Sequence, residues 1–147
     1  MIILLLEDRG SRLYELKEFL KYNGHEVFDC EDVYCAIDMW QKKSAIINCV
    51  IVDLAMSPNG LNDQEASQSG YYTGWVFLWE YVLQTKPGIA SRCIIFSAWS
   101  DSFKLFLPTP EQRGGIEDEC IISKNDSDAK NKLLKTIKRI SDLAGGH

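Results

Sequence analysis

The 147 residues include 46% hydrophobic and 25% charged side chains, the composition of an ordinary globular protein of about one domain. A net charge of −5 argues against a nucleic-acid-binding surface, because affinity for the phosphate backbone is built from clustered lysine and arginine. The apolar start meets Glu7 and Asp8 at once, and no apolar run approaches the roughly 20 residues that span a bilayer. We therefore expect a cytoplasmic protein without a membrane segment.

Short apolar runs alternate with amphipathic stretches along the chain. Continuous apolar runs predict strands buried on both faces, and apolar residues at helical spacing predict helices between them. The expected strands are Ile2–Leu6, His25–Cys30, Val50–Val52, Cys93–Phe96 and Cys120–Ser123. The expected helices are Ser11–Tyr22, Asp32–Lys43, Gly74–Gln84, a short one within Ser100–Leu107, which Pro108 and Pro110 cannot continue, and Ser127–Leu143.

The alternation of strands and helices predicts right-handed βαβ units and a doubly wound α/β fold. One parallel sheet would carry helices on both faces, in a single domain over residues 1–147 with no output domain attached. A polar stretch without periodicity, about residues 57–72, predicts a long inserted loop after the third strand. In such sheets the functional site lies beyond the carboxyl ends of the strands, at the topological switch point.

Polar side chains stand where four of these strands end. Glu7 and Asp8 follow the first strand, Asp53 the third, Ser97 the fourth and Lys124 the fifth. Three carboxylates close together repel, and at least one takes up a proton unless a cation is present. A small set of oxygen ligands suits Mg²⁺. A carboxylate can also act as a nucleophile and form an aspartyl-phosphate, and phosphoryl transfer requires cations against the phosphoryl oxygens. The strand ends therefore predict a site for phosphoryl chemistry.

The runs LLLEDRG, CVIVDLAMSP, CIIFSAWS and CIISKN resemble, in order and in spacing, the receiver domain of two-component response regulators. The resemblance covers nearly the whole chain. The chain resembles the stand-alone, chemotaxis-type receivers, of which it would be an atypical member. It implies a flavodoxin-like sheet of five strands in the order 2-1-3-4-5, which places the first and third strands side by side at the switch point.

The resemblance also implies a role for each strand-end residue. Asp53 would accept a phosphoryl group from a histidine kinase or a histidine phosphotransfer protein, and Ser97 and Lys124 would contact the phosphoryl oxygens. The ligands of Mg²⁺ would be Glu7 through water, Asp8, Asp53 and the backbone carbonyl of Ala55. The signal would then pass to a downstream protein by protein–protein contacts.

The sequence departs from the family pattern around this site. Pro58 stands five residues after Asp53 where the family has a proline four residues after, and Asn125 replaces the proline that normally follows the lysine with a cis peptide. Ile121 occupies the position of the usual aromatic switch residue, and prolines predict an irregular fourth helix. These departures leave an alternative: a degenerate, receiver-like interaction module that no longer uses phosphorylation.

A hydrolase of the haloacid dehalogenase type is a third reading, because it also uses an aspartate nucleophile at a strand end. That family needs a second aspartate two residues later as general acid, and this chain has Ala55 there. We therefore rank the hydrolase below both receiver readings and do not expect an enzyme that turns over a separate substrate.

The five cysteines show no CxxC spacing, so a zinc or redox motif is not predicted, and we expect reduced, mostly buried thiols. Cys49, Cys93 and Cys120 each stand four residues before a site residue, which predicts a row of thiols on one face of the sheet. Core packing is its expected meaning, and a redox or metal role is the alternative.

The expected helix over residues 74–83 is apolar nearly all round, and such a helix is normally buried on every side. One face would pack on the sheet. The inserted loop could cover the other face, with Tyr71 and Tyr72 as anchors, or that face could form a homodimer or partner interface.

Overall fold

Five parallel strands form one sheet at the centre of the computed structural model, which describes residues 1–145; residues 146 and 147 of the predicted domain lie outside the described part. The sheet has the order β2-β1-β3-β4-β5, as predicted. Its strands are β1 (Ile2–Leu6), β2 (Glu26–Cys30), β3 (Cys49–Val52), β4 (Cys93–Ser97) and β5 (Ile121–Ser123). The flavodoxin-like, doubly wound fold class is therefore confirmed.

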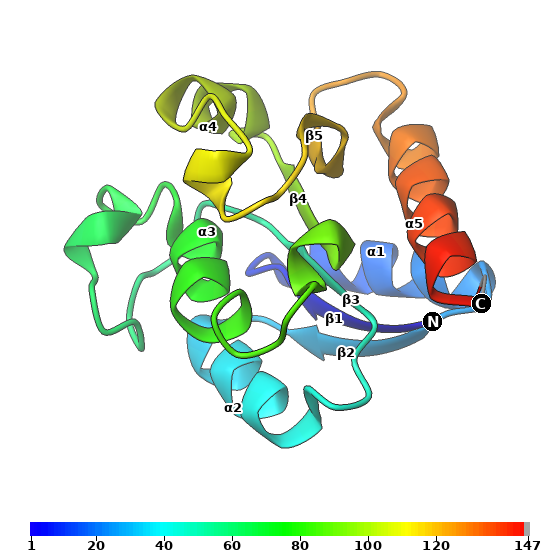
Figure 1. Ribbon diagram of the computed structural model, residues 1–147. Helices are drawn as coiled ribbons and strands as arrows, with labels where there is room; N and C mark the ends of the chain where they lie inside the picture. Colours follow the sequence, from blue (N-terminus) through cyan, green and yellow to red (C-terminus); the bar gives the residue numbers. More distant parts are fainter. Residues whose placement is uncertain (146–147) are drawn as a thin grey trace.

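Helices cover both faces of the sheet (Figure 1). One face carries α1 and α5, whose leucines and isoleucines pack on Ile3, Leu5 and Ile51; the other carries α2, α3 and α4. No helix within residues 1–145 is both long and apolar enough to cross a membrane. The helices are α1 (Gly10–Tyr22), α2 (Val33–Lys43), α3 (Thr73–Phe77, continued by a π-helical turn over Leu78–Val82), α4 (Ser100–Phe106) and α5 (Ala129–Gly145).

β3 is apolar at every position, and β4 is apolar up to its last residue, Ser97, because both faces of these central strands are covered. In β3, Val50 and Val52 join the layer under α2 and α3, whereas Cys49 and Ile51 join the layer under α1 and α5. Val50 pairs with Cys93 in the parallel register, so Cys49 and Cys93 point to opposite faces. The predicted row of thiols on one face is therefore wrong. Burial raises the pKa of Cys49 to about 12, in keeping with a packing role.

The expectation that all five cysteines are reduced is also wrong, because Cys30 and Cys35 form a disulfide. Cys30 is the last residue of β2, and Cys35 lies in the first turn of α2. The tight connection between them places their Cα atoms 5.4 Å apart, inside the range that a disulfide requires. Spacing alone did not reveal the pair, since it depends on where the strand ends and the helix begins.

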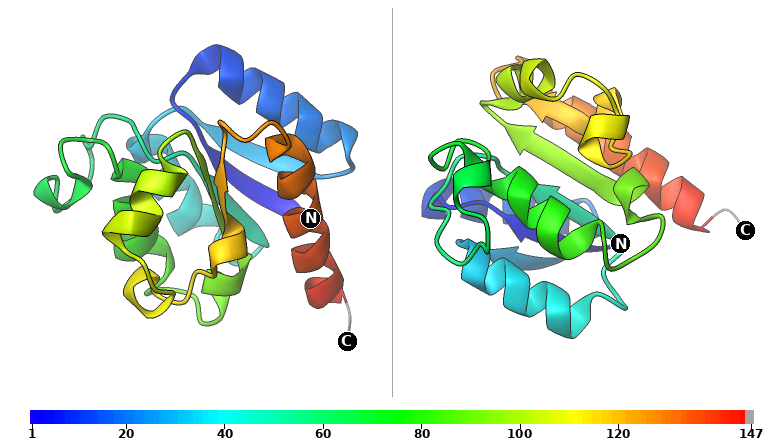
Figure 2. Two further views of the ribbon diagram at one scale, coloured as in Figure 1. Left: turned by 90° about the horizontal axis from the view of Figure 1, so that it is seen from above. Right: turned by 60° about the vertical axis from the view of Figure 1, so that its left-hand side comes forward.

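The predicted loop after β3 is present and is closed at its base (Figure 2). Met56 N–H donates to the carbonyl of Gly70 at 3.0 Å, and the Thr73 hydroxyl donates to the carbonyl of Met56 at 2.7 Å. Gln68, Ser69 and Gly70 all have positive φ, a left-handed run that turns the chain back toward its starting point. We call Met56, Gly70 and Thr73, which these hydrogen bonds join, the neck of the loop.

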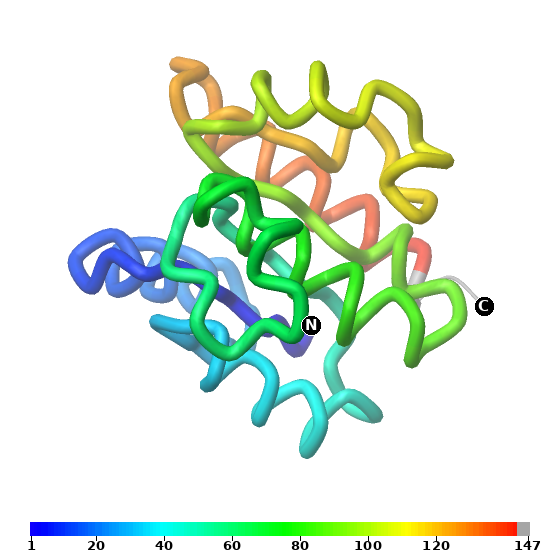
Figure 3. The backbone as a smooth tube through the Cα atoms, turned by 90° about the vertical axis from the view of Figure 1, so that its left-hand side faces the viewer, coloured from blue at the N-terminus to red at the C-terminus, as the bar shows by residue number. Residues whose placement is uncertain are grey.

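The face of α3 that points away from the sheet is covered by the chain itself. Trp75 packs on Phe103 of α4, with ring centroids 5.5 Å apart, and Tyr72 packs on Phe103 and Phe106 at 5.6 and 5.1 Å. Figure 3 shows α3 lying between α2 and α4. Tyr72 therefore is an anchor, as expected, but α4 supplies much of the cover; Trp79 remains 45% exposed. A homodimer through residues 74–83 stays a prediction.

The fourth helix is short and is followed by an irregular connection, as the prolines predicted. This connection packs around Arg113, whose side chain is fully buried. The guanidinium donates to the carbonyls of Leu107 at 2.9 Å and Ile116 at 3.1 Å and forms an ion pair with Asp118. The arginine thus satisfies backbone acceptors that an irregular segment would otherwise leave unpaired.

The start of α3 packs directly on the backbone of Asp53. Gly74 N–H donates to the carbonyl of Leu54 at 3.0 Å, and a Cβ atom at Gly74 would lie 1.9 Å from the carbonyl oxygen of Asp53. Only a residue without a side chain allows this approach.

We therefore predict that Gly74→Ala lowers the free energy of unfolding by at least about 2 kcal/mol, since backbone must move on one side of the contact. Urea denaturation measures the change. Gly10→Ala is the matched control, because a Cβ atom there would meet only the carboxylate of Glu31, at an ordinary van der Waals distance of 3.9 Å; it should leave stability unchanged or raise it by up to about 1 kcal/mol. Equal effects of the two substitutions would contradict the close-packing argument.

Candidate functional site

Five polar side chains meet at the carboxyl edge of the sheet, where the sequence predicted them. Leu6 pairs with Val52 and Ser97 with Ser123, so the ends of the neighbouring strands are nearly level. β1 and β3 are adjacent although β2 separates them in sequence, which is the topological switch point of this fold. The five residues are Glu7 and Asp8 after β1, Asp53 after β3, Ser97 at the end of β4 and Lys124 after β5.

Three of these residues form an acidic cluster. Glu7, Asp8 and Asp53 each offer a carboxylate oxygen, and these oxygens all lie within 4.8 Å of one another. Glu7 is buried, Asp53 is partly buried and Asp8 is exposed. The cluster therefore extends from the interior of the edge to the solvent.

Lys124 supplies the positive charge within this cluster. Its ammonium group donates to a carboxylate oxygen of Glu7 and, at 3.0 Å, to Oδ2 of Asp53. The other oxygen of Asp53, Oδ1, accepts the N–H of Leu54 at 2.7 Å. Lys124 N–H also donates to the carbonyl of Ser97 at 3.0 Å, which continues the β4–β5 pairing and fixes where the side chain starts.

The surroundings move the pKa values of the acids apart. Burial alone would raise the pKa of Asp53, but the Lys124 ammonium and a hydrogen bond with Ser97 outweigh it, so the pKa is lowered. Burial and the charge of Asp53 raise the pKa of Glu7, and the same two causes raise the pKa of Asp8. Asp53 is therefore the carboxylate that stays ionised most readily, as a nucleophile or a cation ligand must.

The donor set fits a small divalent cation. All three groups are carboxylates, the hard oxygen ligands that Mg²⁺ prefers, and Lys124 balances only one of their three charges when all are ionised. Ala55 lies partly buried in the chain leaving β3, two residues after Asp53, and the role of its carbonyl as a ligand stays a prediction.

Two contacts near the site were not predicted. Gly74 fixes the backbone of Asp53, and only its place at the start of a helix hinted at this. Tyr71, from the loop after β3, packs against Trp99, from the loop after β4, with ring centroids 4.7 Å apart and the ring planes tilted by 53°. Both rings are exposed, at 49% and 41%. The pair joins the two loops that follow Asp53 and Ser97.

The residues that depart from the family pattern have ordinary structural roles. The side chain of Asn125 donates to the carbonyl of Ala98 at 3.2 Å, which ties the end of β5 to the end of β4. The Lys124–Asn125 peptide is trans, since residues 1–145 contain no cis peptide bond. Ile121, in the position of the switch residue, is buried in the core.

Solved structures with this architecture include a response-regulator receiver domain from Clostridium thermocellum. The two share 22% sequence identity over 97% of this chain and 98% of the other, with a TM-score of 0.67. A fusion carrying a trimeric coiled-coil segment of yeast Spc42 aligns over 99% of this chain and 82% of its own, at 12% identity and a TM-score of 0.61. The receiver domain of the hybrid histidine kinase CckA aligns at 17% identity over 80% of this chain and 100% of its own. Its TM-score is 0.42, too low to support an argument about the fold.

The chain therefore has the fold of a receiver domain. No model of a known protein family matches the sequence, and the search of curated proteins finds no significant relative.

The raised pKa of Glu7 predicts how stability depends on pH in the absence of divalent cations. The folded chain holds this proton to a higher pH than the unfolded chain does, so the stabilisation is complete at low pH and is lost as pH rises through the raised pKa. Glu7→Gln removes this dependence. We expect its stability relative to wild type to increase from about pH 5 to about pH 8, measured by urea denaturation in EDTA. Glu15→Gln, at an exposed position on α1, is the control, and a Glu7→Gln difference as flat as the control would contradict the prediction.

Proposed function

We propose that this chain is a signalling receiver that accepts a phosphoryl group on Asp53 in a Mg²⁺-dependent reaction. The observation that carries the proposal is the position of Asp53: it is ion-paired with Lys124 and lies within 4.8 Å of two further carboxylates at the switch point. The donor would be a phosphohistidine on a histidine kinase or a phosphotransfer protein, acting in the cytoplasm, and the output would be a contact with a downstream protein.

The geometry suggests a role for each residue in the transfer. The Asp53 carboxylate would attack phosphorus, forming an O–P bond as the P–N bond of the phosphohistidine breaks. Leu54 N–H holds Oδ1 and Lys124 holds Oδ2, so the carboxylate is oriented before the donor arrives. Once Asp53 carries the phosphoryl group, Lys124 and the Ser97 hydroxyl would bind its oxygens.

Glu7, Asp8, Asp53 and the carbonyl of Ala55 would hold the Mg²⁺, which when bound supplies positive charge to the phosphoryl oxygens. The protein's own contribution is to keep Glu7 and Asp8 beside Asp53. The Glu7 carboxylate is buried and accepts hydrogen bonds from Lys124 and from Arg9 N–H, which hold it in place, whereas Asp8 is exposed to solvent.

The two alternatives differ in how far the present observations bear on them. Ala55 places a methyl group where a haloacid-dehalogenase-type hydrolase needs its general acid, which disfavours that enzyme. The degenerate-module reading keeps the same fold, so it is separated from the proposal only by chemistry at Asp53.

Incubation with acetyl phosphate and Mg²⁺ tests the proposal. We expect wild type to gain one phosphoryl group by intact mass, Asp53→Asn to gain none, and Lys124→Ala to be labelled more weakly because an oriented cation is lost. Asp38→Asn, an exposed carboxylate on α2, should label like wild type. If wild type stays unmodified and binds neither Mg²⁺ nor beryllofluoride, the chain is an interaction module.

The aspartyl-phosphate should be long-lived. Trp99 stands two residues after Ser97, donates its backbone N–H to the Ser97 hydroxyl at 3.1 Å and packs at a tilt against the ring of Tyr71. We infer that this ring pair borders the approach to Asp53. Ala55 offers no polar side chain to orient an attacking water. We expect Trp99→Glu to speed hydrolysis by about tenfold by supplying that group.

The matched control for hydrolysis is Trp79→Glu, a similarly exposed tryptophan on the π-helical turn, which should leave the lifetime unchanged. Decay is followed by intact mass after removal of the donor. Equal lifetimes for Trp99→Glu and wild type would refute the idea that the indole limits access of water.

A further inference from the structure

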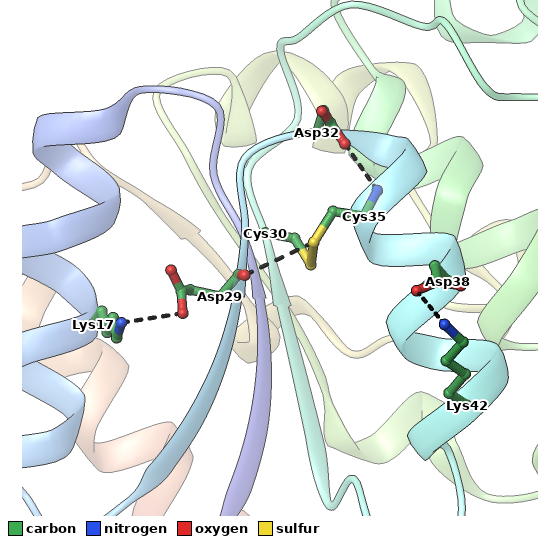
Figure 4. The surroundings of a disulfide bond; sticks show 7 residues. All are labelled: Lys17, Asp29, Cys30, Asp32, Cys35, Asp38 and Lys42. Carbon is green, nitrogen blue, oxygen red and sulfur yellow. Dashed lines mark hydrogen bonds and ion pairs between the residues drawn. A yellow bond between two sulfur atoms is a disulfide. The ribbon is translucent and has the colours of Figure 1, made fainter.

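The disulfide between Cys30 and Cys35 lies at the same edge of the sheet as the acidic cluster, one strand away. Figure 4 shows the two sulfur atoms joined between the end of β2 and the first turn of α2. The other three cysteines are buried free thiols within the core. The Cys30–Cys35 bond is therefore the only disulfide within residues 1–145.

The pair is connected directly to the first residue of the cluster. Leu6 pairs with Cys30 at the last register position between β1 and β2, and the carbonyl of Cys30 accepts the N–H of Glu7 at 3.1 Å. The backbone that carries one sulfur thus holds the backbone of Glu7. A change in the mobility of the Cys30 backbone would therefore reach Glu7 through one hydrogen bond.

Contacts other than the disulfide also hold this turn. The Asp32 carboxylate accepts the N–H of Cys35 at 2.8 Å and caps α2, and Lys17 pairs with Asp29 at 3.2 Å (Figure 4). The sulfur of Cys35 also lies 3.9 Å from the carbonyl of Asp29, which a thiol can donate to. Reduction should therefore loosen this turn without unfolding α2.

We propose that Cys30 and Cys35 are a reversible dithiol–disulfide site whose oxidation state sets how firmly the backbone of Glu7 is held beside Asp53. The effect on cation binding rests on the proposed function, whereas the redox reaction and its effect on Glu7 do not. Disulfides in reducing compartments are usually transient and redox-sensing, which suits a bond placed beside a site rather than across the core.

The chemistry is thiol–disulfide exchange with a small disulfide such as oxidised glutathione. The Cys35 thiolate, on the less buried residue, attacks one sulfur of glutathione disulfide, which forms a mixed disulfide and releases one glutathione thiolate. The Cys30 thiolate then attacks the Cys35 sulfur and releases the second glutathione. Two electrons pass from the cysteines to glutathione, and the two cysteine protons pass to the released thiolates.

The redox reaction is tested on the full chain equilibrated with mixtures of oxidised and reduced glutathione, then denatured and alkylated. Intact mass should show three alkyl groups on the oxidised form and five on the reduced form, with Cys30 and Cys35 as the protected pair. Cys49→Ala should still lose two thiols on oxidation, and Cys35→Ala should lose none. Full alkylation of wild type at every glutathione ratio would overturn the proposal.

The coupling is tested by exchange of backbone amides in the metal-free protein, followed by nuclear magnetic resonance. Reduction should speed exchange of the Glu7 amide by at least about threefold. The Asp53 amide, which donates to the carbonyl of Leu6 at 2.8 Å on the other side of β1, is the internal control and should not change. Identical Glu7 exchange in both oxidation states would overturn the coupling.

A Mg²⁺ titration in both oxidation states separates this inference from the proposed function. Tighter binding by the oxidised form, by about threefold or more, supports both, because a held ligand loses less freedom on binding. If neither form binds Mg²⁺ but the Glu7 amide still responds, the redox coupling stands and the proposed function fails. If both forms bind Mg²⁺ equally and the Glu7 amide is silent, the coupling fails and the proposed function stands.

Discussion

The ammonium group of Lys124 is the interaction on which the edge of the sheet depends. It pairs with Glu7 and Asp53, whose side chains are 2% and 12% exposed, and is itself only 14% exposed. A buried carboxylate that loses its partner is strongly destabilising. The charge of Lys124, which follows the edge strand β5, therefore ties that strand to the carboxylates at the ends of β1 and β3. β5 has only three residues, and Lys124 follows it directly. The charges of the candidate site therefore also hold this short edge strand in place.

Much of the fold could be predicted because a sheet covered on both faces leaves a plain signal in the sequence. β3 is apolar throughout and β4 is apolar up to Ser97, so their place in the centre was clear. What could not be predicted depends on register and on ends. The side to which Cys49 points follows from the pairing of Val50 with Cys93, and the Cys30–Cys35 bond follows from where β2 stops. Neither can be read from spacing alone.

The candidate site was predictable to the extent that it is made of strand ends. Asp53, Ser97 and Lys124 meet because parallel strands end at one edge, which the order of elements already implied. Contacts between loops were hidden, since Tyr71 and Trp99 belong to segments without periodicity and meet only through the path of each chain. Gly74 was hidden for another reason. Its importance lies in what it lacks, and a glycine at a helix start is common in sequences.

The neck of the loop makes the geometry around Asp53 independent of how long the loop is. Because Met56 pairs with Gly70 and Thr73 bonds to Met56, the chain enters and leaves the excursion at one place, and Gly74 then returns it to the backbone of Asp53. The entropy of closing a loop grows only with the logarithm of its length, so residues could be added or removed beyond the neck at little thermodynamic cost. The segment is thus a natural point for divergence: relatives could acquire new recognition surfaces there, or an engineer could graft a peptide, while the geometry around Asp53 is inherited unchanged.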